Sequence, residues 1–127
     1  MTRHKIFEYR DNGEIRKCVL NVSAYSGKTK QIFVEFDLPD GDPWTYVTIA
    51  LKDSPVSIPW CSYVDEYNNP GISKELERLD FAAPYEGNLA IEYGGVRCPL
   101  YVFNKDILRE YDPDGVRKYE DKNSLYD

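Results

Sequence analysis

The chain has 127 residues, a formal net charge of −6, three cysteines and one histidine. A domain of this length buries enough surface to fold without disulfides, and dispersed cysteines with one histidine are a poor ligand set for structural zinc. The odd cysteine count and the lack of an apolar stretch at the N-terminus predict a reducing compartment and a cytoplasmic location. We expect no membrane contact, because no apolar run approaches the ~20 residues of a membrane helix.

The N-terminal part of the chain predicts a β-hairpin. Asn12 and Gly13 separate two strand-like runs, KIFEYR and EIRKCVLNVSAY, and a two-residue turn of this kind needs positive φ at both positions. Within the second run, apolar and polar residues alternate over 18–24, which is typical of a strand with one buried face. The three cysteines are expected to be core thiols.

The next two runs continue this pattern. In QIFVEFDL the apolar residues are expected to face the core, while Gln31, Glu35 and Asp37 are expected on a solvated face. The segment 44–51 follows the turn PDGDP and is expected to be one strand with Val47 inside. Its outward side chains are expected to be Trp44, Tyr46 and Thr48. Such consecutive strands predict an antiparallel meander.

A short helix is expected to begin at Pro70 and to include Leu79. Asn69 is a favourable N-cap, and Pro70 suits the first helical position because its missing N–H would be unpaired there. Ser73 is an alternative cap. The helix is expected to run for about two turns, because apolar residues recur at helical spacing. These residues are Ile72, Leu76 and Leu79.

Two further strands and a second helix are expected in the C-terminal half. NLAIEY and RCPLYVF read as strands, and Pro99 is expected to place the second at a sheet edge or in a bulge, since proline cannot donate to a ladder. Asn104 then caps a helix over KDILREY, with Phe103 and Leu108 at the spacing of a hydrophobic staple. The Asp-Pro pair at 112–113 is expected to end this helix.

Together these elements predict a single α+β domain over residues 1–112. It is expected to contain an antiparallel sheet of about five to six strands with two short helices. Residues 113–127 are expected to form a polar C-terminal tail that frays or docks.

No catalytic or cofactor signature is present in the sequence. A Ser–His or Cys–His nucleophile needs a nearby base, and the only histidine, His4, lies close to the N-terminus. The chain contains neither a P-loop nor GxGxxG, and its acids lack the order of a calcium loop. We therefore expect no enzymatic activity, no metal and no cofactor.

Negative charge is concentrated in the middle of the chain. Residues 31–66 hold seven acids against one lysine, which disfavours direct nucleic-acid binding and suits a basic protein partner. Tyrosine and tryptophan, which are favoured at protein interfaces, are frequent in and beside this region. Alternatively, the acids only solvate the surface and the rings close one end of the core. The candidate protein-binding residues are Asp37, Asp40, Asp42, Trp44, Tyr46, Tyr63, Asp65, Glu66 and Tyr67.

Several segments resemble a family of short bacterial proteins of unknown function. The chain carries YVDEYNNPGI before the first expected helix and CPLYVFN before the second, and the family carries similar elements, VD.NN.P.I and YPLY.F. Two positions depart from this pattern: Cys98 replaces an aromatic residue, and Glu66-Tyr67 replaces a smaller polar residue. The resemblance covers residues 18–112. It implies a plasmid, integrative-element or phage origin, and it implies no active site.

We therefore expect a non-enzymatic protein-binding module that inhibits a host defence nuclease, of the anti-CRISPR or anti-restriction type. Carboxylates spaced like phosphates would occupy a basic nucleic-acid channel of that nuclease. Two other functions remain open. One is a small-molecule-binding or carboxylate-dependent hydrolytic domain, which predicts a concave site with convergent acids of perturbed pKa. The other is a structural accessory of a conjugative element or phage.

Overall fold

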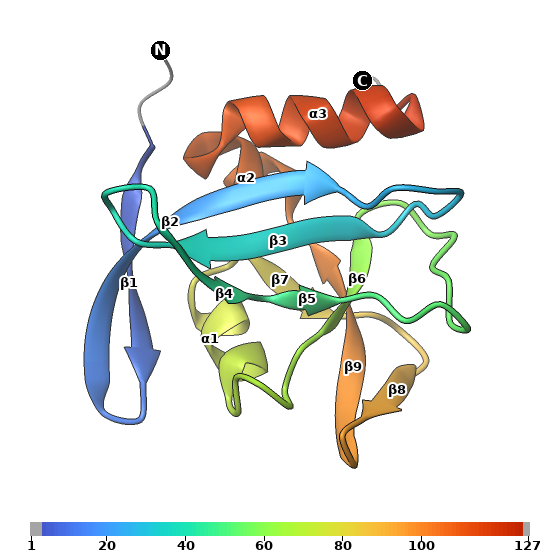
Figure 1. Cartoon of the computed structure of the whole chain (residues 1–127), viewed down its shortest axis with the longest axis horizontal. Coiled ribbons are helices and arrows are strands. Elements are labelled where there is room, and N and C mark those ends of the chain that lie inside the picture. The colour runs from blue at the N-terminus through green and yellow to red at the C-terminus, as the bar shows by residue number, and fades with distance from the viewer. Residues whose placement is uncertain (1–3, 126–127) are drawn as a thin grey trace.

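The structure, a computed structural model, describes residues 4–125, which form two antiparallel sheets and three helices (Figure 1). The strands are β1 (Ile6–Asp11), β2 (Glu14–Ala24), β3 (Ile32–Asp37), β4 (Pro43–Tyr46), β5 (Thr48–Ile49), β6 (Cys61–Val64), β7 (Ala82–Pro84), β8 (Ala90–Tyr93) and β9 (Val96–Phe103). The helices are α1 (Ile72–Arg78), α2 (Lys105–Tyr111) and α3 (Pro113–Asn123). The first sheet has the order β1-β2-β3-β4; the second has the order β5-β6-β9-β7, with β8 paired to β9. The α+β class with antiparallel pairing is therefore confirmed, although the strands are divided between two sheets.

The first sheet is the expected meander. Asn12 and Gly13 have φ angles of 50° and 85°, and they join β1 to β2 in the predicted hairpin. The core side of β2 and β3 is also the predicted one. Its buried side chains are Cys18, Leu20, Val22, Ile32, Val34 and Phe36.

The run 44–51 does not form one strand. β4 pairs with β3 in the first sheet, and β5 pairs with β6 in the second. The chain changes sheet at Val47, whose N–H donates to the Val34 carbonyl and whose carbonyl accepts from the Asp65 N–H, both at 2.9 Å. Two side chains that were expected to face solvent, Thr48 and Trp44, face the protein interior instead. Thr48 is buried with its hydroxyl accepting from the Val34 N–H, and Trp44 packs against the core.

β9 lies inside the second sheet. Its residues 100–103 pair with β6 and β7, while 96–99 pair with β8. The expectation of an edge strand from Pro99 is therefore wrong for the strand as a whole. The proline is tolerated because N–H groups alternate in direction along a strand. Leu100 donates to the Leu89 carbonyl on the β8 side, so the Pro99 nitrogen faces the opposite side, where 96–99 have no paired strand among the described residues.

α1 forms where a helix was expected, but it begins at Ile72 and not at Pro70, and a different side chain caps it. The N-cap residue is Gly71, and the Glu66 carboxylate accepts from the N–H groups of Gly71 at 2.9 Å and Ser73 at 2.7 Å. Asn69 instead donates to a backbone carbonyl of β4, and Pro70 precedes the helix. The expected caps, Asn69 and Ser73, are therefore wrong. An acid from the preceding loop binds the helix N-terminus in their place.

α2 begins and ends as expected, but the chain after it is not a tail. Asn104 caps α2 by accepting from the Ile107 N–H. Asp112 ends α2 and is also the N-cap of α3, with Pro113 at the first helical position. Of the two expectations for the polar C-terminal segment, docking holds for its described part, which is a helix that packs on β2. The sequence did not predict this helix because an Asp-Pro pair can both stop one helix and start the next. The ordered unit therefore extends past residue 112.

Asp112 joins α3 to the first sheet. It is buried, and its carboxylate accepts from the Val22 N–H at 2.8 Å and the Gly115 N–H at 3.1 Å. β1 pairs with β2 only as far as Val19, so the Val22 N–H lies on a sheet edge that α3 covers (Figure 1). A Cβ at Gly115 would collide with the Val22 carbonyl oxygen, so only glycine allows this approach.

One hydrophobic core joins the sheets and the helices. Phe7 and Phe81 contact each other, and both contact the rings of Phe36 and Tyr111, with ring centroids 4.9 to 6.2 Å apart. Tyr119 of α3 is fully buried in the same cluster. The three cysteines are buried and free, which confirms them as core thiols, and burial raises the pKa of Cys61 to about 11.

We expect Asp112→Ala to lower the free energy of unfolding by about 2–4 kcal/mol, because it removes the cap of α3 and leaves the Val22 N–H without an acceptor. Asp106→Ala is the matched control, since it removes an exposed acid from the first turn of α2. It is expected to cost less than about 1 kcal/mol. Urea unfolding at neutral pH measures both, and equal losses would contradict an anchoring role for Asp112.

Candidate functional site

The solvent side of the first sheet gathers polar and aromatic side chains in adjacent rows. Phe33, Glu35 and Asp37 alternate along β3, with β2 side chains opposite them in register. Tyr46 of β4 pairs with Glu35 on the other side. This surface, called the outer face below, consists of Val19, Asn21, Ser23, Tyr25, Phe33, Glu35, Asp37 and Tyr46.

Three polar residues that the alternation places in solvent are buried. Glu35 and Asp37 are 7% and 8% exposed, and Gln31 is also buried. β3 lies between β2 and β4, so side chains of both neighbours flank it. Burial of the Gln31 amide is tolerated because it donates to the Ile49 carbonyl and the Ser62 hydroxyl, both at 2.7 Å. The alternation of apolar and polar residues assigns each β3 side chain to the correct side of the strand. It does not show that neighbouring segments shield both sides from solvent.

A carboxyl pair occupies the centre of the outer face. Asn21 Nδ2 donates to Glu35 Oε2 at 3.0 Å and to Asp37 Oδ2 at 3.2 Å, so one amide holds both acids. Burial, together with the neighbouring Asp37, raises the pKa of Glu35 to about 7, while the hydrogen bond from Asn21 acts in the opposite direction. Near neutral pH the Glu35 carboxyl is therefore partly protonated.

A polar cavity of about 420 Å³ adjoins this pair. Asp37 reaches its wall, and its Oδ1 is buried without a hydrogen-bond partner among the described residues. The β3–β4 turn and the first turns of α3 complete the cavity. Its charged and titratable lining residues are His4, Asp37, Asp40, Asp112, Asp114 and Lys118. Acids outnumber cations here, so the cavity has a negative potential.

A groove lined by aromatic rings lies toward the other end of the outer face. It has a volume of about 350 Å³, and Tyr25, Phe33, Tyr46 and Tyr93 contribute to its walls. Phe33 makes edge contacts with Tyr25 and Tyr46, with centroids 5.4 and 5.8 Å apart. Tyr67 adjoins the groove through an edge contact with Tyr93, with ring centroids 5.2 Å apart. We call this hollow the tyrosine groove.

Sequence-predicted site residues are divided among several places. Tyr46 and Asp65 line the tyrosine groove, and Tyr67 adjoins it. Asp37 and Asp40 line the polar cavity instead. The remaining predicted residues lie elsewhere: Asp42 is exposed in the β3–β4 turn, Trp44 packs against the main core, Tyr63 packs against a smaller cluster with Cys61 and Leu100, and Glu66 caps α1.

The predicted acids do not form one exposed acidic surface, because several of them support the fold. Asp65 is buried and accepts from both the backbone N–H and the side-chain amide of Asn68, at 3.0 and 2.7 Å. Glu66 holds the N-terminus of α1. Acids in loops and at helix ends often accept such local hydrogen bonds from the backbone. A count of charges in the sequence does not distinguish these acids from acids that are free to bind a partner.

Sequence reasoning missed Asn21, Glu35 and Tyr93 as site residues. Glu35 and Asp37 stand two apart in a strand pattern, which places them on the same side, and this signal was available. Their burial and the bridging Asn21 depend on the pairing of β2 with β3. Tyr93 comes to the groove from β8, far along the chain, so no local pattern predicts its contact with Tyr67.

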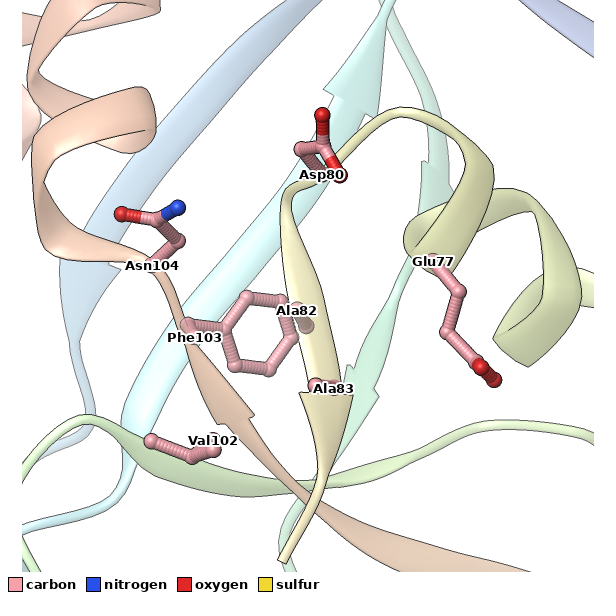
Figure 2. A pocket seen from close by; sticks show the side chains of 7 residues that line it. All are labelled: Glu77, Asp80, Ala82, Ala83, Val102, Phe103 and Asn104. Carbon is pink, nitrogen blue, oxygen red and sulfur yellow. The ribbon is translucent and has the colours of Figure 1, made fainter.

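A separate hollow of about 360 Å³ lies against β7 and β9 (Figure 2). Its floor is mostly apolar, and Figure 2 shows Glu77 and Asp80 extending away from Phe103. Glu77 already accepts from the Tyr101 hydroxyl at 2.6 Å, and Asn104 already caps α2. This hollow therefore brings together fewer convergent polar groups than the outer face.

Within residues 4–125, no group of three or more His, Cys, Asp or Glu side chains is arranged to hold a metal ion. In the same part of the chain, no helix has the length and apolar character needed to cross a membrane.

No protein-family model matches the chain, and no curated protein or solved structure matches it either. The family resemblance noted from the sequence therefore stays a prediction, and functional inference rests on the geometry of the outer face.

We expect Glu35→Gln to change the pH dependence of stability. The pKa of Glu35 rises from 4.5 to about 7 on folding, so the native state binds this proton more tightly than the unfolded chain, and stability falls as pH rises through that window. The glutamine variant lacks this loss and gains relative to the wild type at about pH 8 more than at about pH 5. Urea midpoints across this range measure the difference.

Glu92→Gln on exposed β8 is the control for the loss of one carboxyl group. If the glutamine variant at position 35 and the wild type show parallel pH profiles, folding does not raise the pKa of Glu35.

Proposed function

We propose that this protein is a non-enzymatic module that binds a basic protein through the tyrosine groove and the outer face, and that its target is a host defence nuclease of the CRISPR or restriction type. One observation carries the proposal: three large aromatic side chains are exposed around one groove. Tyr46, Tyr67 and Tyr93 are 59%, 46% and 36% exposed. Clustered exposed aromatic rings are typical of protein-binding surfaces.

The rings around the groove are already positioned for contact. Tyr46 packs against Phe33, and Tyr67 packs against Tyr93, each in an edge contact. A side chain held by a neighbour loses less conformational freedom when a partner binds, so more of its contact energy contributes to affinity. Each tyrosine also keeps a hydroxyl for hydrogen bonding at the rim of an interface.

Charge supports a basic partner. The chain has a net charge of −6, and the outer face continues from the tyrosine groove to the carboxyl pair and the polar cavity. A partner with lysine and arginine at its contact surface would be attracted by this field. Nucleic-acid-binding nucleases carry such surfaces, and the association would weaken as salt concentration rises.

The proposed mode of binding gives the tyrosines the anchoring role and the acids a steering role. Asp65 and Glu66 are occupied in hydrogen bonds that hold a turn and a helix N-terminus. Reversing their charge would disturb folding and would not report on binding. Asp42 is exposed in the β3–β4 turn and lies outside the polar cavity, so it is the acid at which charge reversal tests steering. Asp40 lines that cavity, and its Oδ1 accepts from the Asp42 N–H at 2.9 Å, so it also supports the turn.

We expect the double variant Tyr46→Ala/Tyr67→Ala to lose partner binding by about 100-fold or more, since hot-spot aromatic residues each contribute about 2 kcal/mol or more. The matched control is Ile15→Ala, which removes an apolar side chain that is 63% exposed on the first hairpin. The measurement is a pull-down from a bacterial lysate containing CRISPR and restriction effectors, washed at low and at high salt, followed by nuclease assays with the retained protein.

A single basic nuclease should be retained by the wild type and by the Ile15 variant, be released at high salt, and be inhibited in cleavage. Retention of that nuclease by the double tyrosine variant would exclude the groove as the contact site. If folded wild type retains and inhibits no nuclease, the proposed target is wrong.

A further inference from the structure

We infer that the tyrosine groove is a binding site for a guanidinium group, supplied by an arginine side chain of the protein partner. The inference rests on the proposed basic partner and names the side chain that enters the groove. Its test uses short peptides and needs no nuclease, so a wrong nuclease target and a wrong groove ligand give different results.

Aromatic rings from several separate strands form the walls of the groove. Phe33 contacts the rings of Tyr25 and Tyr46 at interplanar angles of 78° and 70°, and Tyr93 reaches the groove from β8. Rings that stand at steep angles around one hollow present faces as well as edges to a ligand inside it. The face of an aromatic ring attracts a cation, so these walls favour a positively charged ligand.

The rings on the β8 side are held in place by the backbone. Tyr67 and Tyr93 contact each other at an interplanar angle of 89°. A Cβ at Gly94 would collide with the Tyr67 ring, so this ring lies directly against the turn between β8 and β9. Rings that are fixed before binding lose little conformational freedom when a ligand arrives.

The charge of the groove also favours a cation. Among the described residues that line it, Asp65 is the only charged one, and none is a lysine, arginine or histidine. Asp65 is 3% exposed, so water screens its charge only weakly. Burial raises the pKa of Tyr25 to about 12, and the charge of Asp65 acts on this hydroxyl in the same direction. The field of the acid therefore extends to the wall of the groove.

A guanidinium fits the groove better than an ammonium, because the polar atoms of the lining already have partners. Both oxygens of Asp65 accept from Asn68. The Thr48 hydroxyl accepts from the Val34 N–H and pairs with the Tyr25 hydroxyl. An ammonium needs acceptors around one strongly hydrated nitrogen, whereas a guanidinium is weakly hydrated and stacks flat on a ring. The volume of about 350 Å³ also admits the alkyl stem of arginine.

The test is a nuclear magnetic resonance titration of the full chain, observing the ring signals of Tyr46 and Tyr93. The probe is a blocked Gly-Arg-Gly peptide, added up to about 20 mM, where a site with a Kd of about 2 mM is about nine-tenths filled. The comparison probes, at equal ionic strength, are the same peptide with lysine, the same peptide with citrulline, and tetramethylammonium. Citrulline keeps the planar shape of arginine and lacks its charge. We expect saturable shifts with the arginine peptide and a Kd at least about threefold lower than that of each comparison probe.

Tyr46→Leu/Tyr93→Leu is expected to weaken binding of the arginine peptide about tenfold, or about threefold for each ring, since leucine keeps apolar bulk and lacks an aromatic face. The matched control is Tyr46→Phe/Tyr93→Phe, which keeps both rings and is expected to bind within about threefold of the wild type. Both tyrosines are partly exposed, so the core is expected to stay intact in each variant, and the backbone amide spectrum checks this.

Absence of saturable shifts with the arginine peptide, an equal Kd for the citrulline peptide, or unchanged binding in the leucine variant would overturn the inference. Equal or tighter binding of the lysine peptide or of tetramethylammonium would also overturn it, and would assign the groove to an ammonium or a methylated cation. A chain that binds the arginine peptide but retains no nuclease would exclude only the proposed target.

Discussion

The hydrogen bond from the Val22 N–H to the Asp112 carboxylate connects β2 of the first sheet to the start of α3. The position of α3 beside the outer face depends on this contact. β1 covers only one half of the free edge of β2, and the other half needs another partner. Asp112 provides it while capping α3, and Lys122 near the end of α3 donates to the carbonyls of Gly27 and Thr29. α3 is thus held along β2 and the loop after it, and its first turns become a wall of the polar cavity.

β3 carries apolar side chains on one side and acidic side chains on the other. Val34 and Phe36 fill the core, while Glu35 and Asp37 project from the opposite side of the same strand. Strand geometry brings residues two apart onto one side, and the neighbouring β2 adds Asn21 between the two acids. A buried acid pair costs stability that a pair of apolar residues would not. Such local departures from the usual pattern are characteristic of functional positions in folded proteins.

The acids of residues 31–66 have different structural roles, and a count of negative charges does not distinguish these roles. Glu66 stabilises the N-terminus of α1, Asp65 stabilises a turn, and Asp37 faces a cavity. Of the predicted binding residues, the fold brings two tyrosines, Tyr46 and Tyr67, to one groove, whereas the predicted acids are dispersed. Tyr46 and Tyr67 meet Tyr93, a residue from a distant hairpin, around one groove, because β4, the loop after β6 and β8 converge on the same side of the molecule.

Local patterns in the sequence determined the first hairpin, the core sides of β2 and β3, the extent of α1 and the cap of α2, because each depends on residues a few positions apart. The Asp112-Pro113 pair was ambiguous, since the same two residues stop a helix and start one, and only the fit of Gly115 against Val22 decided that α3 follows. The change of sheet at Val47 and the burial of Glu35 were likewise tertiary decisions. Alternation assigns a side chain to one side of a strand, but whether that side meets water depends on distant segments that pack beside it.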